Sequence, residues 1–266
     1  MKPRTLILRA AGTNCDAETA RAFELAGATA EAIHINRILE RPSIIADFQI
    51  LALPGGFSHG DDIAAGRILA NQIAHHLSDA FHDFVEAGKP IIGICNGFQI
   101  LIKTDLLPGS MAGRTGQTCT LAHNDSGRFI DLWVNLGGKS KKCIWTQGID
   151  RIELPIAHGE GKLVCLDEDV RKALWANDQV ALVYTREDGS PAGHSSANPN
   201  GSTDDIAGVC DATGLVLGLM PHPERHVSPL QHPAWTRSTT LPNEGAGLAI
   251  FRNAVAHVNA GVGVGV

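Results

Sequence analysis

The sequence predicts an α/β fold: a central, mostly parallel β-sheet flanked by helices, with a small antiparallel excursion. Short apolar runs alternate with segments of helical spacing in the N-terminal part of the chain, as in the strand–helix–strand units of a parallel sheet. The run 90–94 is apolar on both faces, as a strand covered by helices on both sides must be. Beyond residue 117, short strand-like runs follow one another without long helices between them, which favours antiparallel pairing.

Strands and helices are expected to alternate in the N-terminal part. Asp16 is suited to begin a helix and Gly27 to end one. Phe98, Leu101 and Ile102 recur at helical spacing. The expected elements are strands at 5–9, 29–35, 49–53 and 90–94 and helices at 16–26, 66–87 and from 96 onward.

The remaining part is expected to combine short strands with two helices. The expected elements are strands at 118–122, 129–136, 143–145, 180–184, 206–211 and 215–220 and helices at 169–176 and 245–259. Residues 187–203 and 228–244 are rich in Gly, Pro, Ser, Asn and Thr and are expected to be long surface loops. We therefore expect one domain over 1–260, followed by a disordered tail at 261–266.

Composition narrows the classes of function. The 266-residue chain has a net charge of -6 and a pI near 6.0, which argues against binding to a nucleic-acid backbone. No apolar run approaches the length of a membrane span, and residues 1–4 lead into a strand-like segment rather than a signal-peptide core. We expect a cytoplasmic protein with no nucleic acid and no membrane among its partners.

The six cysteines form no C-x-x-C pair and show no spacing typical of a zinc site, so reduced thiols are expected and disulfides are not. His222 and His226 have the spacing of helical metal ligands, but Pro223 between them is incompatible with a helix interior. No metal site is predicted.

Cys95 is the candidate nucleophile. It stands between Gly93 and Gly97 in the segment GICNG, where a strand is expected to turn sharply into a helix. This is the spacing of a nucleophile elbow, in which flanking glycines allow a turn too tight for side chains. The unpaired N–H groups and positive dipole end of the helix stabilise a thiolate there. The alternative is a cysteine that serves only as a small core residue.

A second candidate feature is the diglycine Gly55–Gly56, which closely follows the strand at 49–53. In an open parallel sheet, ligands bind beyond the carboxyl ends of the strands, so this loop and the Cys95 turn are expected to face one crevice. The N–H groups of Gly56 and Asn96 could then form an oxyanion hole. The alternative is an ordinary turn.

His222 is the candidate base. Pro221 and Pro223 fix the chain on both sides of it, and Glu224 follows two residues on, so that a carboxylate is available to hold the imidazole in one tautomer. A single histidine at a strand end is often structural or merely exposed. The combination of a cysteine, a histidine and an acid favours catalysis.

Gln99 lies one helical turn beyond Cys95, so its amide could reach a substrate at the thiol; an exposed helix residue is the alternative. Two Gly-rich loops, 123–128 and 157–161, are expected at the rim of a pocket or in contact with a partner. Neither has the G-x-x-x-x-G-K-[ST] phosphate cradle, and no G-x-G-x-x-G follows a strand. The sequence has no recognisable ATP site.

The segments GICNGFQIL, LALPGGFSHGDD, LAHNDSGRF, PIAHGEGK and DIAGVCDATGLVLGLMPHPER together resemble the class I (triad) glutamine amidotransferases, in the branch formed by glutaminase subunits of purine-biosynthetic synthases. The resemblance runs from Leu6 to Val255 in the family's order and implies a flavodoxin-like domain. It implies a Cys95 nucleophile, a His222 base and acid, and Glu224 as the partner of His222. The implied substrate-binding residues are Gly55, Gly56, Asn96 and Gln99, with Gly56 and Asn96 as oxyanion donors.

The resemblance implies that L-glutamine is hydrolysed through a thioester to glutamate and ammonia. No cofactor is implied in this chain. ATP and Mg²⁺ are expected in a large ATP-dependent synthetase subunit that receives the ammonia, and some bacterial members also require a small accessory subunit.

Two other classes of function stay open at this point. A stand-alone cysteine hydrolase of γ-glutamyl substrates could use the same groups on the same fold. A non-catalytic interaction subunit is the other class. Loss of catalytic activity in evolution usually removes the nucleophile or the base, but Cys95, His222 and Glu224 are all present.

Overall fold

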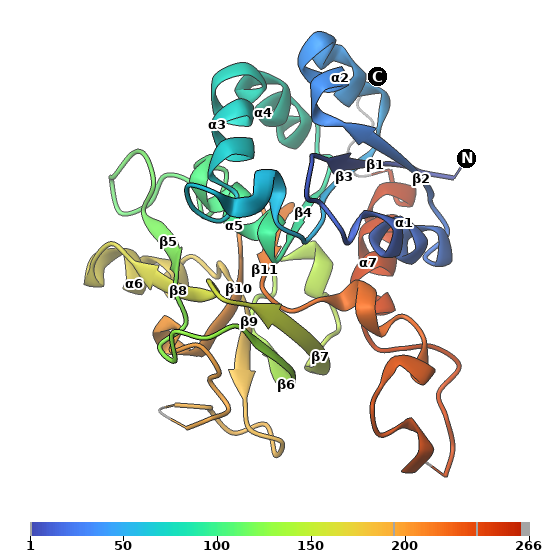
Figure 1. Ribbon diagram of the computed structural model, residues 1–266, viewed down its shortest axis with the longest axis vertical. Coiled ribbons are helices and arrows are strands. Elements are labelled where there is room, and N and C mark those ends of the chain that lie inside the picture. Colours follow the sequence, from blue (N-terminus) through green and yellow to red (C-terminus); the bar gives the residue numbers. More distant parts are fainter. Residues whose placement is uncertain (1, 194, 238, 262–266) are drawn as a thin grey trace.

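The computed structural model describes residues 2–193, 195–237 and 239–261. A nine-stranded sheet runs through its centre in the order β2-β1-β3-β4-β11-β10-β9-β6-β7 (Figure 1). The pairings from β2 to β11 are parallel, and those from β11 to β7 are antiparallel. The predicted α/β fold is confirmed. The predicted tail, beyond Gly261, lies outside the described residues.

The parallel half forms the core of the fold. Its strands are β1 (Arg4–Arg9), β2 (Thr29–His34), β3 (Ile50–Leu53), β4 (Ile91–Ile94) and β11 (Val216–Leu219). Every residue of β3, β4 and β11 is buried, because helices cover both faces of these central strands. β2 lies at the edge of the sheet, and most of its residues are exposed.

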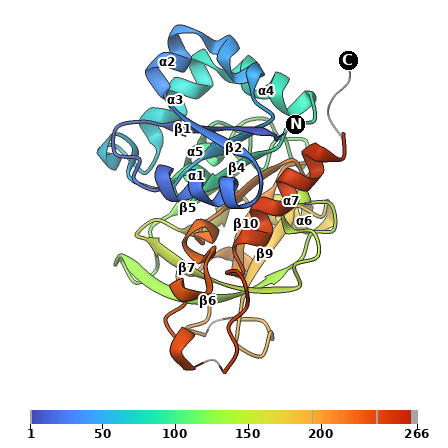
Figure 2. The same ribbon diagram turned by 90° about the vertical axis from the view of Figure 1, so that its right-hand side faces the viewer.

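Seven α-helices are described. They are α1 (Asp16–Leu25), α2 (Ile35–Glu40), α3 (Arg67–His76), α4 (Ser78–Glu86), α5 (Asn96–Lys103), α6 (Glu168–Ala176) and α7 (Leu248–Asn259). α1 and α7 lie side by side on one face of the parallel strands, and α3 and α5 lie on the other (Figures 1 and 2). This arrangement leaves the carboxyl ends of β1, β3, β4 and β11 free to carry loops.

The antiparallel half consists of β6 (Ile130–Gly138), β7 (Arg151–His158), β9 (Val180–Thr185) and β10 (Ile206–Cys210). The predicted excursion is therefore in large part a continuation of the main sheet. Of the strands in the described part of the chain, only β5 (Cys119–Ala122) and β8 (Lys162–Cys165) form a separate two-stranded sheet. Short 3₁₀ helices complete the chain: η1 (Pro42–Asp47), η2 (Ser58–Asp61), η3 (Ile144–Thr146), η4 (Thr203–Asp205), η5 (Pro223–His226), η6 (Pro229–Gln231) and η7 (Trp235–Arg237).

Two predicted elements are wrong. The single helix at 66–87 is two helices, because the backbone of Leu77 leaves the helical region at φ -129°. Leu77, at the break, and Phe81, in α4, are both buried. The strand predicted at 143–145 is wrong because Ile144 and Trp145 lie in η3. Trp145 is fully buried there, and its carbonyl accepts a hydrogen bond from Asn253 Nδ2 of α7.

Two strands and one helix were not predicted. β7 contains Pro155, which cannot donate to a ladder and therefore argues against a central strand; β7 is the last strand of the sheet, where proline is tolerated. β8 has only four residues. α2 begins at Ile35, where a strand was expected to continue, because His34 Nδ1 accepts the Asn36 N–H at 3.3 Å and caps the helix.

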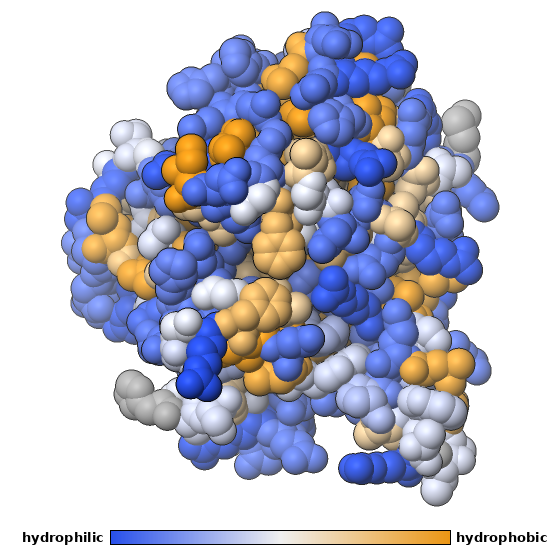
Figure 3. Space-filling view, viewed as in Figure 1, coloured by the Kyte–Doolittle hydropathy of each residue, from blue (hydrophilic) through white to orange (hydrophobic). Residues whose placement is uncertain are grey.

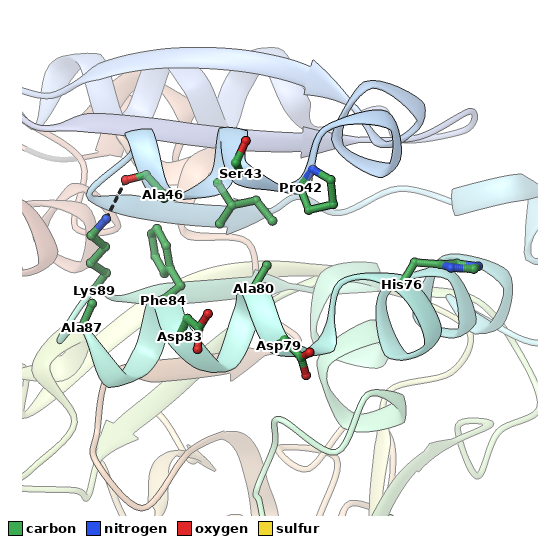
Figure 4. A pocket seen from close by; sticks show the side chains of 11 residues that line it. Pro42, Ser43, Ala46, His76, Asp79, Ala80, Asp83, Phe84, Ala87 and Lys89 are labelled. Carbon is green, nitrogen blue, oxygen red and sulfur yellow. Dashed lines mark hydrogen bonds between the residues drawn. The ribbon is translucent and has the colours of Figure 1, made fainter.

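A hollow of about 460 Å³ lies between η1 and α4 (Figure 4). Lys89 crosses one end of it and donates from Nζ to the Ala46 carbonyl at 2.8 Å. Lys89 precedes β4, so this hollow lies at the amino ends of the parallel strands, whereas ligands of such sheets bind at the carboxyl ends.

Among the described residues, no helix combines the length and apolar character needed to cross a membrane.

Candidate active site

Cys95 stands at the corner between β4 and α5. Its backbone has φ 53° and ψ -104°, a conformation that is costly for a residue with a side chain and is typical of functional turns. The Cys95 N–H donates to the Leu219 carbonyl of β11 at 2.8 Å, which fixes the corner to the sheet. The thiol is 6% exposed, and its Sγ lies 3.7 Å from the Ala157 carbonyl oxygen.

Both glycines of the elbow are required by close packing. A β-carbon on Gly97 would lie 1.9 Å from the Leu53 carbonyl oxygen, and one on Gly93 would lie 2.6 Å from the Gly97 carbonyl oxygen. Real β-carbons do not approach so closely. The turn therefore needs glycine on both sides of Cys95, as the spacing in the sequence predicted.

His222 and Glu224 form a buried pair beside Cys95. His222 Nδ1 lies 2.6 Å from Glu224 Oε1, and the two residues are 2% and 1% exposed. The backbone N–H of His222 donates to the Pro155 carbonyl of β7 at 2.8 Å, so the loop after β11 is held against the antiparallel half of the sheet. Since Glu224 engages Nδ1, the other ring nitrogen, Nε2, remains to exchange a proton.

The electrostatics of the site favour the charged imidazolium. Burial alone lowers the pKa of His222, but the Glu224 carboxylate and then the Cys95 and Cys15 side chains raise it, and the net pKa lies well above the usual value. A histidine that holds a proton next to a thiol can stabilise a thiolate and later protonate a leaving group.

Gly55 and Gly56 lie where the sequence analysis placed them, in the loop after β3 that faces Cys95. A β-carbon on Gly55 would meet His222 Cε1 at 2.8 Å and Cys95 Cβ at 3.4 Å, so the missing side chain leaves room for the two groups to approach each other. Gly56 has φ 141°, and a β-carbon there would lie 2.7 Å from the Asn14 backbone nitrogen. No other residue type fits either position without displacement.

Asn96 and Gln99 are joined to each other and are both buried. Asn96 Nδ2 donates to Gln99 Oε1 at 2.9 Å and to Asp61 Oδ1 at 3.1 Å, and Asn96 Oδ1 accepts the Ser58 N–H at 3.1 Å. The Asn96 side chain therefore has a structural role. Its backbone N–H, in the first turn of α5, has no partner within the helix and is the group that could bind an oxyanion.

A pocket of about 170 Å³ opens at Cys95. Gln99 lines it and donates from Nε2 to the Glu160 carbonyl at 2.6 Å, so this residue is not an exposed helix residue. The pocket mouth includes the rings of Phe57 and Phe129, whose centroids are 6.4 Å apart. Apolar side chains gather near the middle of the face seen in Figure 3. The two Gly-rich loops supply further lining residues: His123, Ala157, His158, Gly159 and Glu160.

Cys15 is a residue of the site that the sequence analysis missed. Its thiol is 1% exposed, accepts a hydrogen bond from Arg225 Nη2 at 3.2 Å and would lie 3.1 Å from a β-carbon on Gly55. Burial raises the pKa of Cys15. The available signal was its position after the first strand, because the loops at the carboxyl ends of parallel strands gather at one edge.

Side-chain atoms of Cys15, His222 and Glu224 that could coordinate a metal ion all lie within 4.8 Å of one another. These residue types could hold a soft divalent cation. Because the Glu224 carboxylate is engaged with His222 Nδ1, a cation bound by all three would have to compete with that hydrogen bond.

His158 is a second buried histidine that was not singled out in the sequence. Its Nδ1 lies 3.0 Å from Asn124 Oδ1. Burial, and then the charge of His222, lower the pKa of His158 to about 4. His226, which shared the metal-ligand spacing with His222, is buried and directs Nδ1 to the Glu153 carbonyl at 2.9 Å.

Known proteins resemble this chain over nearly its full length. Residues 2–258 match the family described as "CobB/CobQ-like glutamine amidotransferase domain". The phosphoribosylformylglycinamidine synthase subunit PurQ of Dehalococcoides mccartyi is 51% identical over 255 residues, which cover 96% of this chain and 97% of that protein. The subunit of the same name from Treponema denticola is 44% identical over 241 residues, which cover 85% of this chain and 89% of that protein.

The fold has a counterpart among solved structures. A chain of the PurLQS structure from Thermotoga maritima matches with a TM-score of 0.72 and 32% sequence identity, covering 97% of this chain and 100% of the matched one.

Proposed function

The chain belongs to the family of CobB/CobQ-like glutamine amidotransferase domains, and from this premise we propose that it is the glutaminase subunit of a phosphoribosylformylglycinamidine synthase. It hydrolyses L-glutamine to glutamate and ammonia. An ATP-dependent synthetase subunit receives the ammonia and converts formylglycinamide ribonucleotide to formylglycinamidine ribonucleotide, a step of purine biosynthesis. The names of the relatives and their coverage of the whole chain support this assignment.

The observation that carries the chemistry is the buried pair of His222 and Glu224 beside a cysteine in a strained elbow. The Cys95 thiolate attacks the side-chain amide carbon of glutamine, and a tetrahedral intermediate forms. His222 protonates the departing nitrogen, the C–N bond breaks, and ammonia is released. The glutamyl group remains bound to Cys95 as a thioester. His222 then takes a proton from water, whose oxygen attacks the thioester and releases glutamate.

The backbone supplies the stabilisation of the oxyanion. The Gly56 and Asn96 N–H groups come from the two turns that face Cys95, one after β3 and one after β4. Donors that are fixed before the reaction stabilise the negative charge on the intermediate without reorganisation. Gln99, which lines the pocket, contacts the bound glutamine on the side of α5.

The partner is the large ATP-dependent subunit, which holds the ATP and Mg²⁺, and this chain itself uses no cofactor. The solved PurLQS structure supports an assembly of this kind, since one of its chains matches this one over its full length. A small accessory subunit completes the complex in organisms that require it. The protein acts in the cytoplasm, where the nucleotide substrate of the partner is made.

The experiment that tests the proposal is co-purification with the synthetase subunit of the same host, followed by a glutamine-dependent synthesis assay. We expect glutamine to support product formation only when both subunits are present. We also expect glutamate release by this chain to rise when the partner and its ligands bind, because free ammonia would otherwise be wasted. Equal glutamate release with and without the partner would argue against this coupling.

The second candidate function is a stand-alone cysteine hydrolase of γ-glutamyl substrates, which the same elbow and histidine could serve. Release of glutamate from γ-glutamyl peptides by the chain alone, at a rate that the partner does not change, would favour this class.

A further inference from the structure

Cys119 and Cys165 lie opposite each other in the two-stranded sheet formed by β5 and β8; Figure 1 labels these two strands. They are register partners in this antiparallel pair. The Leu166 N–H donates to the Thr118 carbonyl at 2.8 Å, so Thr118 and Leu166 form a hydrogen-bonded pair and the two cysteines occupy the adjacent non-hydrogen-bonded pair. Side chains are closest at such positions, with Cα atoms about 4.5 Å apart. That separation is within the range of roughly 4.4–6.8 Å that a disulfide bridges.

The two thiols differ in environment. Cys119 is 3% exposed, whereas Cys165 is half-buried and reachable from solvent. Interaction with the Cys165 thiol, followed by burial, raises the pKa of Cys119. The more accessible sulfur, that of Cys165, is therefore the one that a small oxidant from solvent meets first, and the buried Cys119 sulfur lies beside it. An attacking thiol with an adjacent resolving thiol has this arrangement.

We propose that Cys119 and Cys165 are a redox modification site, at which hydrogen peroxide converts the two thiols into an intramolecular disulfide. The Cys165 thiolate attacks one peroxide oxygen, the O–O bond breaks, and the departing hydroxide is protonated to water, leaving a sulfenic acid. The Cys119 sulfur then attacks the Cys165 sulfur. An S–S bond forms, the S–O bond breaks, and the departing hydroxide takes the Cys119 proton. Two electrons pass from the thiols to the peroxide, and two water molecules result.

The cross-link would join the strands that carry the rim of the Cys95 pocket. β5 leads into the loop that begins at His123, and β8 follows the loop that contains Glu160; both residues line the pocket. The Asn124 N–H already donates to the Gly159 carbonyl at 2.9 Å. Cys119 and Cys165 are at the opposite end of the two strands from these loops, three register pairs beyond Ala122 and Lys162, so a disulfide would lock the far end of the ribbon that carries both rim loops. The proposal does not depend on the glutaminase function.

The chain contains an internal control pair. Cys143 and Cys210 also interact with each other, but both residues are 0% exposed. Peroxide cannot reach either sulfur without opening of the fold. If Cys119 and Cys165 are oxidised and Cys143 and Cys210 are not, access of peroxide from the surface is required, and closeness of two thiols alone is not sufficient.

The test treats the folded full-length Cys95→Ala variant with hydrogen peroxide, blocks the remaining thiols with iodoacetamide in denaturant, and maps peptides by mass spectrometry. We expect a pair of peptides linked through Cys119 and Cys165 that dithiothreitol separates. Cys143 and Cys210 should be oxidised by peroxide at least about tenfold more slowly and should therefore be recovered in the alkylated form. Alkylation of both Cys119 and Cys165, a bond from either to another cysteine, or irreversible oxidation of Cys165 without a link would overturn the proposal.

Two further variants test the order of attack. In Cys119→Ser, the resolving thiol is absent, so a Cys165 sulfenic acid should accumulate and be trapped by dimedone. In Cys165→Ser, Cys119 should remain reduced under the same treatment. If Cys119 is oxidised as fast in Cys165→Ser as in the parent, the assignment of Cys165 as the attacked sulfur is wrong. Both variants are compared only when their melting temperatures match that of the parent.

Discussion

Glu224 Oε1 lies 2.6 Å from His222 Nδ1, and both side chains are shielded from solvent. Burial of a histidine favours its neutral form, so the carboxylate is what holds the proton on this ring. The pair thus combines two requirements of the proposed reaction. It fixes the direction of the imidazole and it keeps an acid ready for the departing ammonia.

Replacing Glu224 by Gln removes the charge and preserves the shape of the side chain. The pKa of His222 should fall, because burial is then opposed mainly by the thiols. Glutamine turnover should fall by at least about a hundredfold, yet less than in Cys95→Ala or His222→Ala, since the carboxylate only orients and charges the base. NMR titration of the His222 ring measures the first effect and a glutaminase assay the second. An unchanged His222 pKa would contradict the assigned role of Glu224.

Gly55→Ala tests the close approach of the base and the nucleophile. The added methyl group would lie 2.8 Å from His222 Cε1, so the imidazole must move away from Cys95. We expect turnover to fall by about tenfold or more, because small misplacements of reacting groups are costly. The melting temperature should change much less than it does for a core cavity. Turnover equal to that of the parent would show that His222 does not need its present position.

Asn96→Ala tests the hydrogen-bond network beneath the elbow. The change leaves the Ser58 N–H and Gln99 Oε1 without their partner, and each unsatisfied buried group costs about 1–3 kcal/mol. We expect the free energy of unfolding to fall by about 2–4 kcal/mol in denaturant titrations. Asn36→Ala, at an exposed position on α2, is the matched control and should change it by about 0.5 kcal/mol or less. Equal effects of the two substitutions would rule out this network as a source of stability.

His158 should make the fold sensitive to acid. Its pKa is about 4 in the folded chain, against an ordinary value of 6.5, so the unfolded chain binds the proton more readily. Stability is therefore fully present above pH 6.5 and falls as the pH drops toward 4, by about 3 kcal/mol from this group. In His158→Gln, the fall in unfolding free energy between these two pH values should be smaller by about that amount. A parallel pH dependence in both proteins would exclude His158 as the cause.

The parts of the site that lie on one short segment could be predicted from the sequence. Gly93, Cys95 and Gly97 define a turn by their spacing alone, since their roles depend on local backbone geometry. The contribution of Cys15 could not be predicted in the same way. Its neighbours His222 and Arg225 are far along the chain, and only the assembled sheet brings them together.

Several elements of the fold show why local patterns were insufficient. The run from 66 to 87 is helical in its spacing throughout, yet the chain leaves the helical conformation at the buried residue Leu77 and divides into α3 and α4. β7 was not predicted; it contains Pro155, a residue that argues against a central strand, and the structure places it at the end of the sheet, where proline is tolerated. The place of β7 at the end of the sheet is a tertiary property, which local patterns do not carry.

The most direct test of the account uses Cys95→Ala in the complex reconstituted with the ATP-dependent subunit. The thiol serves only to release ammonia, so the variant complex should lose glutamine-dependent synthesis and retain synthesis from added ammonium salts at the rate of the parent. The assembled state is verified by size-exclusion chromatography. Glutamine-dependent synthesis by the variant, or loss of ammonium-dependent synthesis in an intact complex, would contradict the proposed division of labour.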